Sequence, residues 1–139
     1  RMAIQGEPDT ELEDLLGEIE TIQRAAMKPI RAGMIGGEIY AAAAPLVQKS
    51  KHNNHMEFLA HGMGMVSHEA PRLTNRGPVP YPSEYAKEPL EAGMVVSVET
   101  TLMHPARGFI KLEDTVVVTD KGHEVYGEGA RGWNSAGQG

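Results

Sequence analysis

The chain has 139 residues, a formal net charge of −6 and no cysteine. This length fits one domain, the acidic balance argues against binding to nucleic acid or an anionic membrane, and the lack of cysteine excludes disulfide bonds, thiolate zinc sites and a cysteine nucleophile. The acidic charge favours a small or peptide substrate, and the lack of cysteine favours a cytoplasmic protein. Since the chain opens without a signal-peptide pattern and has no apolar run near the ~20 residues of a membrane span, we expect it to be soluble.

A long helix is predicted near the start of the chain. The first six residues resemble the end of a strand. Asp9 and Thr10 can then cap a helix, and Thr10 and Glu13 have capping-box spacing. Apolar residues recur at steps of three and four over residues 12–22, which places an apolar stripe on one helix face. We therefore predict a helix over about residues 10–31, with Pro29 kinking or ending it.

A second helix is predicted from Gly37 or Glu38 to Lys49, and it is followed by a polar connection. This connection carries His52 and His55, which are three residues apart, a spacing that can share a metal ion on a helix. The surrounding asparagines are typical of a loop instead. We interpret these two histidines as exposed loop residues and not as metal ligands.

The stretch Leu59–Arg72 has the composition of a functional site. It places His61 and His68 seven residues apart across a glycine-rich turn. Gly62 and Gly64 allow another backbone or a ligand to come close, so the two imidazoles can face one cavity. We interpret the stretch as a candidate site.

Residues 56–66, which include the first of these histidines, are predicted to be a strand or an extended segment. Residues 74–89 are rich in proline, glycine and tyrosine, and four prolines interrupt every regular pattern. Long loops without regular structure are often elements that cover or bind a substrate. We expect this segment to be a long loop over the site.

Two strands are predicted in the last third of the chain, over residues 94–99 and 109–119, because apolar and polar residues alternate in both. Turn residues lie between them. If the two strands form a hairpin that is symmetric about Ala106, then Glu99 lies opposite Glu113, since each is seven residues from the centre. Two carboxylates would then face each other across the sheet.

Opposed carboxylates repel each other, so a positive charge is expected between them. A divalent cation is the simplest candidate, and the imidazole of His61 would complete a mixed nitrogen and oxygen ligand set that suits Zn, Mn, Fe or Co. Two other interpretations remain open from spacing alone. The register can be shifted so that Glu99 and Glu113 are both exposed, or Lys111 can form a salt bridge with them.

The C-terminal residues carry weaker signals. A short strand is predicted from His123 to Tyr126, and a glycine-rich tail follows it. Trp133 is the only tryptophan of the chain and lies in this tail, where it can anchor the tail to the body of the protein.

Four motifs in register give the chain a specific resemblance to a known family. In this order and spacing they resemble the pita-bread metallopeptidases, which comprise prolidase, aminopeptidase P, methionine aminopeptidase and the non-peptidase creatinase. The resemblance covers essentially the whole chain and implies an α+β fold, in which two helices precede a curved, mainly antiparallel sheet. The motifs are His61–Gly64, His68–Pro71, Leu90–Glu99 and Leu112–Thr115.

The resemblance also implies a function and a set of roles. It implies hydrolysis of a peptide or small amide substrate, in the manner of Xaa-Pro dipeptidases. The enzyme would be a homodimer with two divalent metal ions (Mn, Co, Zn or Fe), and two Asp, one His and two Glu would hold the metals. His61, Glu99 and Glu113 would be metal ligands, and Glu99 would also handle the proton of the attacking water. His68 would be a catalytic group that hydrogen-bonds the substrate, and Arg72 would bind the substrate carboxylate. An exposed loop arginine is the alternative for Arg72.

The chain departs from the family pattern in two ways. Ala60, Thr100 and Lys111 stand where the family usually has Gly, Pro and Arg, which puts strict Xaa-Pro specificity in doubt. Both aspartate ligands of the family lie upstream of the position aligned with Arg1, and no aspartate of this chain matches them. We therefore expect residues 1–139 to be the C-terminal half of a pita-bread catalytic domain, inactive without the N-terminal half.

Two further functions remain open on the same fold. One is a creatinase-like hydrolase of C–N bonds, or a related lyase, which would not need a metal ion. The other is a binding module without enzymatic activity that uses the groove for a protein partner.

Overall fold

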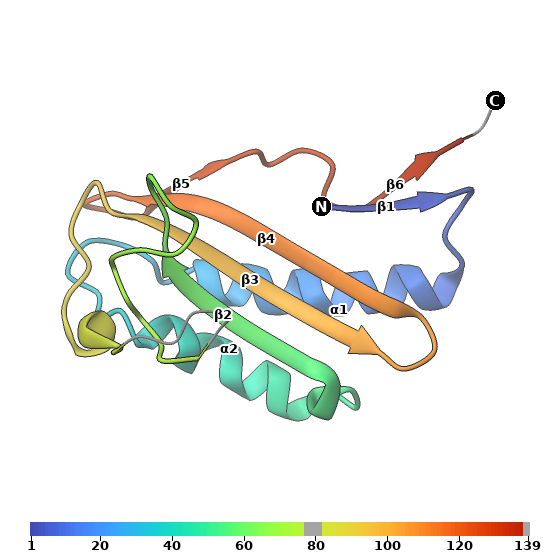
Figure 1. Cartoon of the computed structure of the whole chain (residues 1–139), viewed down its shortest axis with the longest axis horizontal. Coiled ribbons are helices and arrows are strands. Elements are labelled where there is room, and N and C mark those ends of the chain that lie inside the picture. The colour runs from blue at the N-terminus through green and yellow to red at the C-terminus, as the bar shows by residue number, and fades with distance from the viewer. Residues whose placement is uncertain (77–81, 138–139) are drawn as a thin grey trace.

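Two helices cover one face of a four-stranded antiparallel sheet, and a pair of short parallel strands lies beside that sheet (Figure 1). This computed structural model describes residues 1–76 and 82–137. The α+β arrangement is the one expected from the sequence. In chain order the elements are β1 (Met2–Gln5), α1 (Thr10–Met27), α2 (Glu38–Lys49), η1 (Asn53–His55), β2 (Met56–Gly62), η2 (Glu84–Lys87), β3 (Val95–His104), β4 (Gly108–Val118), β5 (His123–Tyr126) and β6 (Trp133–Ala136).

Helix α1 begins at the predicted residue but ends earlier than predicted. The carboxylate of Asp9 accepts a hydrogen bond from the backbone N–H of Leu12 at 3.0 Å, so of the two predicted caps it is Asp9 that caps the helix. The helix ends at Met27 and not at residue 31, because Pro29 has no N–H to continue the ladder. The apolar stripe of the helix is buried against β3 and β4 as predicted.

Helix α2 matches its prediction, whereas the strand that follows it is shorter and the predicted loop is more structured than expected. Helix α2 has the predicted bounds and packs beside β2. Strand β2 ends at Gly62 and not at residue 66, because the chain turns back there. The predicted loop 74–89 contains one short 3-10 helix, η2, and its part at 77–81 lies outside the described residues.

No helix in the described ranges is both long and apolar enough to cross a membrane.

The sheet has the strand order β2-β3-β4-β5, and its register decides which residues share a face. Glu99 of β3 lies opposite Glu113 of β4, as the symmetric hairpin predicts. His61 of β2 lies opposite Ser97, so it is next to this pair in the sheet. The alternate residues of β3 and β4 face the helices and form the core, which leaves the face with both glutamates uncovered by α1 and α2.

The two ends of the chain meet beside the sheet. Strands β1 and β6 pair in parallel, with Met2 beside Trp133 (Figure 1). The indole Nε1 of Trp133 donates a hydrogen bond to the backbone oxygen of Leu12 at 2.8 Å, which confirms the predicted anchor. Strand β6 itself was not predicted, because its four residues show no alternation.

Candidate functional site

His61 and Glu99 form the buried centre of the candidate site. The side chains are 6% and 9% exposed, and His61 Nε2 lies 2.8 Å from Glu99 Oε1. The other ring nitrogen, Nδ1, lies 2.9 Å from the backbone oxygen of Gly62. Burial raises the pKa of Glu99, but hydrogen bonds from His61 and Lys111 outweigh burial and lower this pKa to about 2. Burial lowers the pKa of His61, but the hydrogen bonds to Glu99 and to the backbone of Gly62, together with the negative charges of Glu99 and Glu113, outweigh burial, so the net shift is upward.

His68 reaches this centre because the loop after β2 folds back on the strand. The N–H of Gly62 donates to the oxygen of Pro71 at 2.9 Å, and the N–H of Glu69 donates to the oxygen of Gly62 at 3.0 Å. The imidazole of His68 then stacks on that of His61, with ring centroids 3.9 Å apart. Within the described residues, Nε2 of His68 is buried and has no hydrogen-bond partner. A buried polar atom of this kind is suited to bind a ligand.

The glycine-rich turn has the close approach that the sequence predicted. A Cβ atom on Gly62 would overlap the backbone of Ala70 and Pro71, and one on Gly64 would overlap the carboxylate of Glu69. Glycine is required at position 62 because the close atoms there belong to the backbone, whereas at position 64 the flexible side chain of Glu69 can move aside. Neither position depends on an unusual φ angle.

Glu113 faces the same side of the sheet as Glu99, with a lysine between the two carboxylates. The ammonium of Lys111 contacts Glu99 Oε2 and lies 3.0 Å from Glu113 Oε2. The hydroxyl of Ser97 donates to Glu113 Oε1 at 2.7 Å. The register is therefore the predicted one, and the positive charge between the glutamates in the structure comes from Lys111, one of the two alternatives to a metal ion.

Arg72 lies at the edge of the site. It lines a small pocket together with His61, His68 and the residues that follow it, Leu73 and Thr74. Its guanidinium Nη1 lies 3.4 Å from Glu84 Oε2, and its side chain is 40% exposed. The structure thus places Arg72 beside both histidines, at the mouth of the site.

The donor atoms in this region fit a divalent metal ion. Over residues 1–76 and 82–137, one group of at least three His, Asp or Glu residues is close enough to hold a metal, namely His61, His68 and Glu99, whose donor atoms lie within 4.8 Å of one another. Imidazole nitrogen with carboxylate oxygen is a ligand set for Zn, Mn, Fe or Co. The group contains neither Glu113, which is held by Lys111, nor His52 and His55. His55 is exposed as predicted but ends η1, whereas His52 is half-buried beside the ring of His104 and is not the exposed residue that was predicted.

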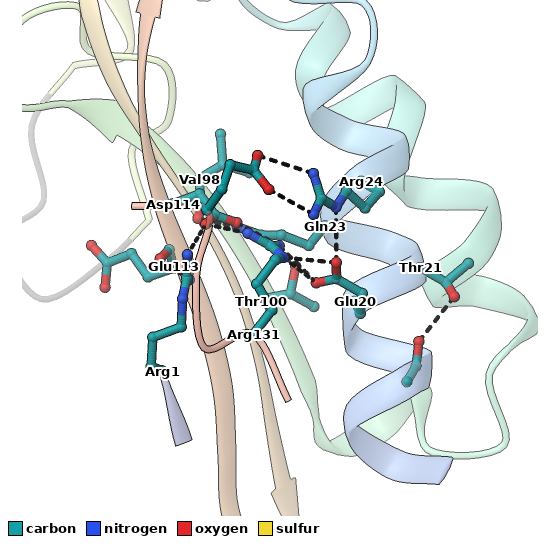
Figure 2. Close-up of polar contacts among 12 residues, drawn as sticks. Arg1, Glu20, Thr21, Gln23, Arg24, Val98, Thr100, Glu113, Asp114 and Arg131 are labelled. Atoms are coloured by element: carbon teal, nitrogen blue, oxygen red, sulfur yellow. Dashed lines mark hydrogen bonds and ion pairs between the residues drawn. The ribbon is translucent and has the colours of Figure 1, made fainter. Parts of the chain in front are cut away.

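A buried polar cluster lies behind the site, between the sheet and α1 (Figure 2). Asp114 is 1% exposed and accepts hydrogen bonds from Arg131 at 2.6 and 2.8 Å and from Gln23 Nε2 at 3.0 Å. Gln23 also donates to the backbone oxygen of Val98 and accepts from the hydroxyl of Thr100 at 2.7 Å. Because Thr100 and Asp114 directly follow Glu99 and Glu113, the cluster holds both glutamate-bearing strands from behind.

The sequence contains a signal for this cluster that the periodicity of apolar residues did not reveal, namely polar residues at core positions. Gln23 lies on the apolar stripe of α1, four residues after Ile19, and Asp114 lies on the core face of β4 between Leu112 and Val116. A polar residue at a core position requires a buried partner. The partner Arg131 comes from the glycine-rich tail, which has no periodicity that would place it.

The comparisons with known proteins agree with this geometry. The model of the metallopeptidase family M24 matches residues 1–120 of the chain. A Xaa-Pro dipeptidase from Pyrococcus furiosus is 26% identical over 123 residues, which are 88% of this chain and 33% of that protein. A Xaa-Pro dipeptidase from Lactobacillus delbrueckii is 27% identical over 127 residues, 91% of this chain and 32% of that protein.

Solved structures share the fold. The X-Pro aminopeptidase of Thermotoga maritima superimposes with a TM-score of 0.80 at 22% identity, over 96% of this chain and 36% of that chain. The prolidase of Pyrococcus furiosus has a TM-score of 0.70 at 26% identity, over 86% of this chain and 33% of that chain. These likenesses confirm the predicted fold class. The chain spans about one third of the length of the relatives that it matches.

Proposed function

Because the chain belongs to metallopeptidase family M24, we propose that it forms part of a metal-dependent peptide hydrolase of the Xaa-Pro dipeptidase class. One observation carries the proposal. His61, Glu99 and Glu113 come from three neighbouring strands and gather on the sheet face that α1 and α2 leave uncovered. The chain is also similar to Xaa-Pro dipeptidases over most of its own length.

In this proposal His61, Glu99 and Glu113 are metal ligands, and the intact site holds two divalent ions (Mn, Co, Zn or Fe). Bound metal ions would lower the pKa of a water molecule so that hydroxide is available near neutral pH. The donor types support this assignment, since an imidazole and two carboxylates suit these ions. The pKa of Glu99 of about 2 keeps its carboxylate ionised, which is the form that binds a cation.

The remaining residues have roles toward a peptide or small amide substrate. Glu99 can accept a proton from the attacking water and deliver it to the leaving amine. Nε2 of His68, which has no hydrogen-bond partner in the described part of the chain, is available to the scissile amide and would stabilise the charge that develops there. Arg72 lines the same small pocket and would bind the substrate carboxylate with its planar guanidinium.

We further propose that two aspartate ligands come from residues outside these 139, so that the chain corresponds to the C-terminal half of the catalytic domain. The positions of its own aspartates support this. Asp9 pairs with Arg107 at 2.7 Å near the hairpin turn, and Asp114 is held in the buried cluster on the helix side of the sheet. The metal-binding group among the described residues includes no aspartate. That the intact protein is a homodimer stays a prediction, which light scattering tests.

Hydrolysis of a Xaa-Pro dipeptide with added Mn²⁺ or Co²⁺ tests the function. We expect no turnover by the 139-residue chain and clear turnover by the intact protein. In the intact protein, His61→Ala and Glu113→Gln should reduce turnover by more than the roughly 10–100-fold that loss of an outer-shell partner costs. His55→Ala, at an exposed position of η1, is the matched control and should leave turnover unchanged. Full activity of both ligand variants would refute the proposed site.

A further inference from the structure

The outer edge of strand β2 carries backbone groups that point away from the rest of the sheet. In the strand order β2-β3-β4-β5, one side of β2 pairs with β3 and the other side is an edge. In an antiparallel strand, the N–H and C=O groups of successive residues point to opposite sides. Ala60 and Gly62 form hydrogen bonds outside the sheet, so the even-numbered residues of β2 are the ones that point to this edge.

Part of this edge is already covered by other segments of the chain. The N–H of Gly62 donates to the backbone oxygen of Pro71 at 2.9 Å. The hydroxyl of Tyr40 donates to the backbone oxygen of Ala60 and accepts a hydrogen bond from its N–H, both at 2.9 Å. Covers of this kind protect an edge strand, because uncovered backbone groups pair readily with another chain.

Phe58 is the edge residue that these covers leave open. Its N–H and C=O point the same way as those of Ala60, which lies two residues further along the strand. Among residues 1–76 and 82–137, neither group of Phe58 has a hydrogen-bond partner on the edge side. The sheet can therefore accept one more strand at this position.

A groove with a volume of about 760 Å³ lies beside the open residue. Helix α2, which lies beside β2 (Figure 1), contributes Ala44 and Val47 to its lining, and the segment 73–76 contributes as well. The volume is within the range of roughly 300–1,000 Å³ that is typical of ligand sites. The charged residues of the described lining are Glu57 and Arg76, whose charges are opposite, so the groove suits a ligand without net charge.

We propose that this groove is a second, non-catalytic binding site, and that it takes an extended, uncharged peptide as an added strand beside Phe58. The open backbone groups identify the occupant. An N–H and a C=O that belong to one residue and point the same way are both satisfied by one residue of an extended peptide. The groove is distinct from the proposed metal site, since its lining includes none of His61, Glu99 and Glu113.

The helix wall of the groove favours particular side chains. Every second side chain of an added strand points to the helix side of the sheet. There it would contact Ala44 and Val47, which are half-buried. Because β-branched residues fit a half-buried extended strand best, we expect a preference for peptides in which valine alternates with an uncharged polar residue.

Fluorescence polarisation with a short labelled peptide of alternating threonine and valine tests the inference. The 139-residue chain is titrated in EDTA, so that binding at the metal site does not contribute. We expect saturable binding with a dissociation constant below about 1 mM. Ala44→Glu places a charge in the groove and should weaken binding about tenfold or more. Ala41→Glu, at an exposed position of α2 outside the groove lining, is the matched control and should bind as wild type does.

Two further measurements test the backbone pairing itself. The same peptide with N-methyl groups on all of its central residues keeps its side chains but cannot donate from them, so it should bind about tenfold more weakly. In hydrogen exchange followed by NMR, saturating peptide should slow the exchange of the Phe58 amide about tenfold or more. The Ala60 amide is already bonded to Tyr40 and should change little.

Each outcome decides for or against the peptide site. A lack of saturable binding up to about 1 mM peptide, equal binding by Ala44→Glu and wild type, or an unchanged Phe58 amide would overturn the inference. Protection of the Phe58 amide without peptide, rising with protein concentration, would assign the edge to a second copy of the chain instead. Should Ala44→Glu not fold, the methylated peptide and the exchange of the wild-type amide decide alone. None of these outcomes involves turnover, so the inference and the proposed function stand or fail separately.

Discussion

Gly62 is the residue on which the approach of His68 to His61 depends. The backbone of Ala70 and Pro71 lies where a Cβ atom of residue 62 would be, and the N–H of Gly62 donates a hydrogen bond to the backbone oxygen of Pro71. We expect Gly62→Ala to lower the free energy of unfolding by about 1–3 kcal/mol, which is typical of a side chain inserted into a packed region. Denaturation in urea measures this change. The loop must shift for a methyl group to fit, so the His61 and His68 rings should also lose their stacking.

Gly17 provides the matched control for this substitution. It lies on the exposed face of α1, and no atom lies within 4 Å of the position of an added Cβ. Gly17→Ala should therefore stabilise the protein by about 0.5–1 kcal/mol through helix propensity. Destabilisation by both substitutions to the same extent would contradict the close-approach argument.

At the scale of the elements, the buried cluster behind the site depends on one arginine from the C-terminal tail. Arg131 has a side chain 11% exposed and pairs with Asp114 and Glu20 at 2.6 Å each. Burial raises the pKa of Asp114, but the hydrogen bonds from Arg131 and Gln23 outweigh it, so the net shift is downward. Asp114 is thus a charged residue in the core.

Replacing Arg131 by Met should remove most of the positive charge and hydrogen bonding that stabilise the buried carboxylate of Asp114. We expect Arg131→Met to lower the free energy of unfolding by about 3 kcal/mol, the lower end of the range for breaking a buried pair, because Arg1 still contacts Asp114 at 2.9 Å. Arg24→Met is the control, since Arg24 pairs with Glu20 and Glu128 at the surface and should cost at most about 1 kcal/mol. Denaturant unfolding of both variants decides the matter, and equal losses would argue against a structural role for the buried cluster.

The features that could be predicted from the sequence are those set by local periodicity. Alternation along two strands and turn residues centred on Ala106 predicted Glu99 opposite Glu113 as one of the registers that spacing left open, and the structure has that register. Glycine spacing likewise predicted that either another backbone or a ligand comes close near His61, and the structure shows the backbone of Ala70 and Pro71 there. Each of these depends on residues close together in the chain, so the sequence contains the information directly.

The features that could not be predicted depend on contacts between distant segments. The stacking of His68 on His61 requires the loop to close on Gly62, which no periodicity reveals. Spacing left a metal ion and Lys111 as alternatives between the glutamates, since a lysine rotamer is decided by its surroundings. Arg131 reaches Asp114 from a tail of glycine and polar residues. Each of these contacts is settled by tertiary packing.

At the scale of the whole molecule, the C-terminal tail is fastened to α1 through Glu20. This carboxylate accepts hydrogen bonds from Arg131 and Arg24 at 2.6–2.9 Å. Burial raises the pKa of Glu20, and the two arginines outweigh burial, so the net shift is below the ordinary value of 4.5. A group whose pKa is lowered by folding stabilises the protein fully above its unfolded pKa, and this contribution is lost as the pH falls through the folded value.

Acid should therefore weaken the contact between the tail and α1, and Glu20→Gln should remove this part of the pH dependence. We expect the variant to be about 1–2 kcal/mol less stable than wild type at pH 7, after discounting for partial exposure of Glu20, with a difference that shrinks as the pH falls below 4.5. Fluorescence of Trp133, the only tryptophan, monitors the tail directly, because its indole N–H donates a hydrogen bond to the backbone oxygen of Leu12 in α1. Glu13→Gln, at an exposed position of the same helix, should stay within about 0.5 kcal/mol of wild type at every pH. A difference between Glu20→Gln and wild type that is constant or grows in acid would show that the charge on Glu20 does not hold the tail.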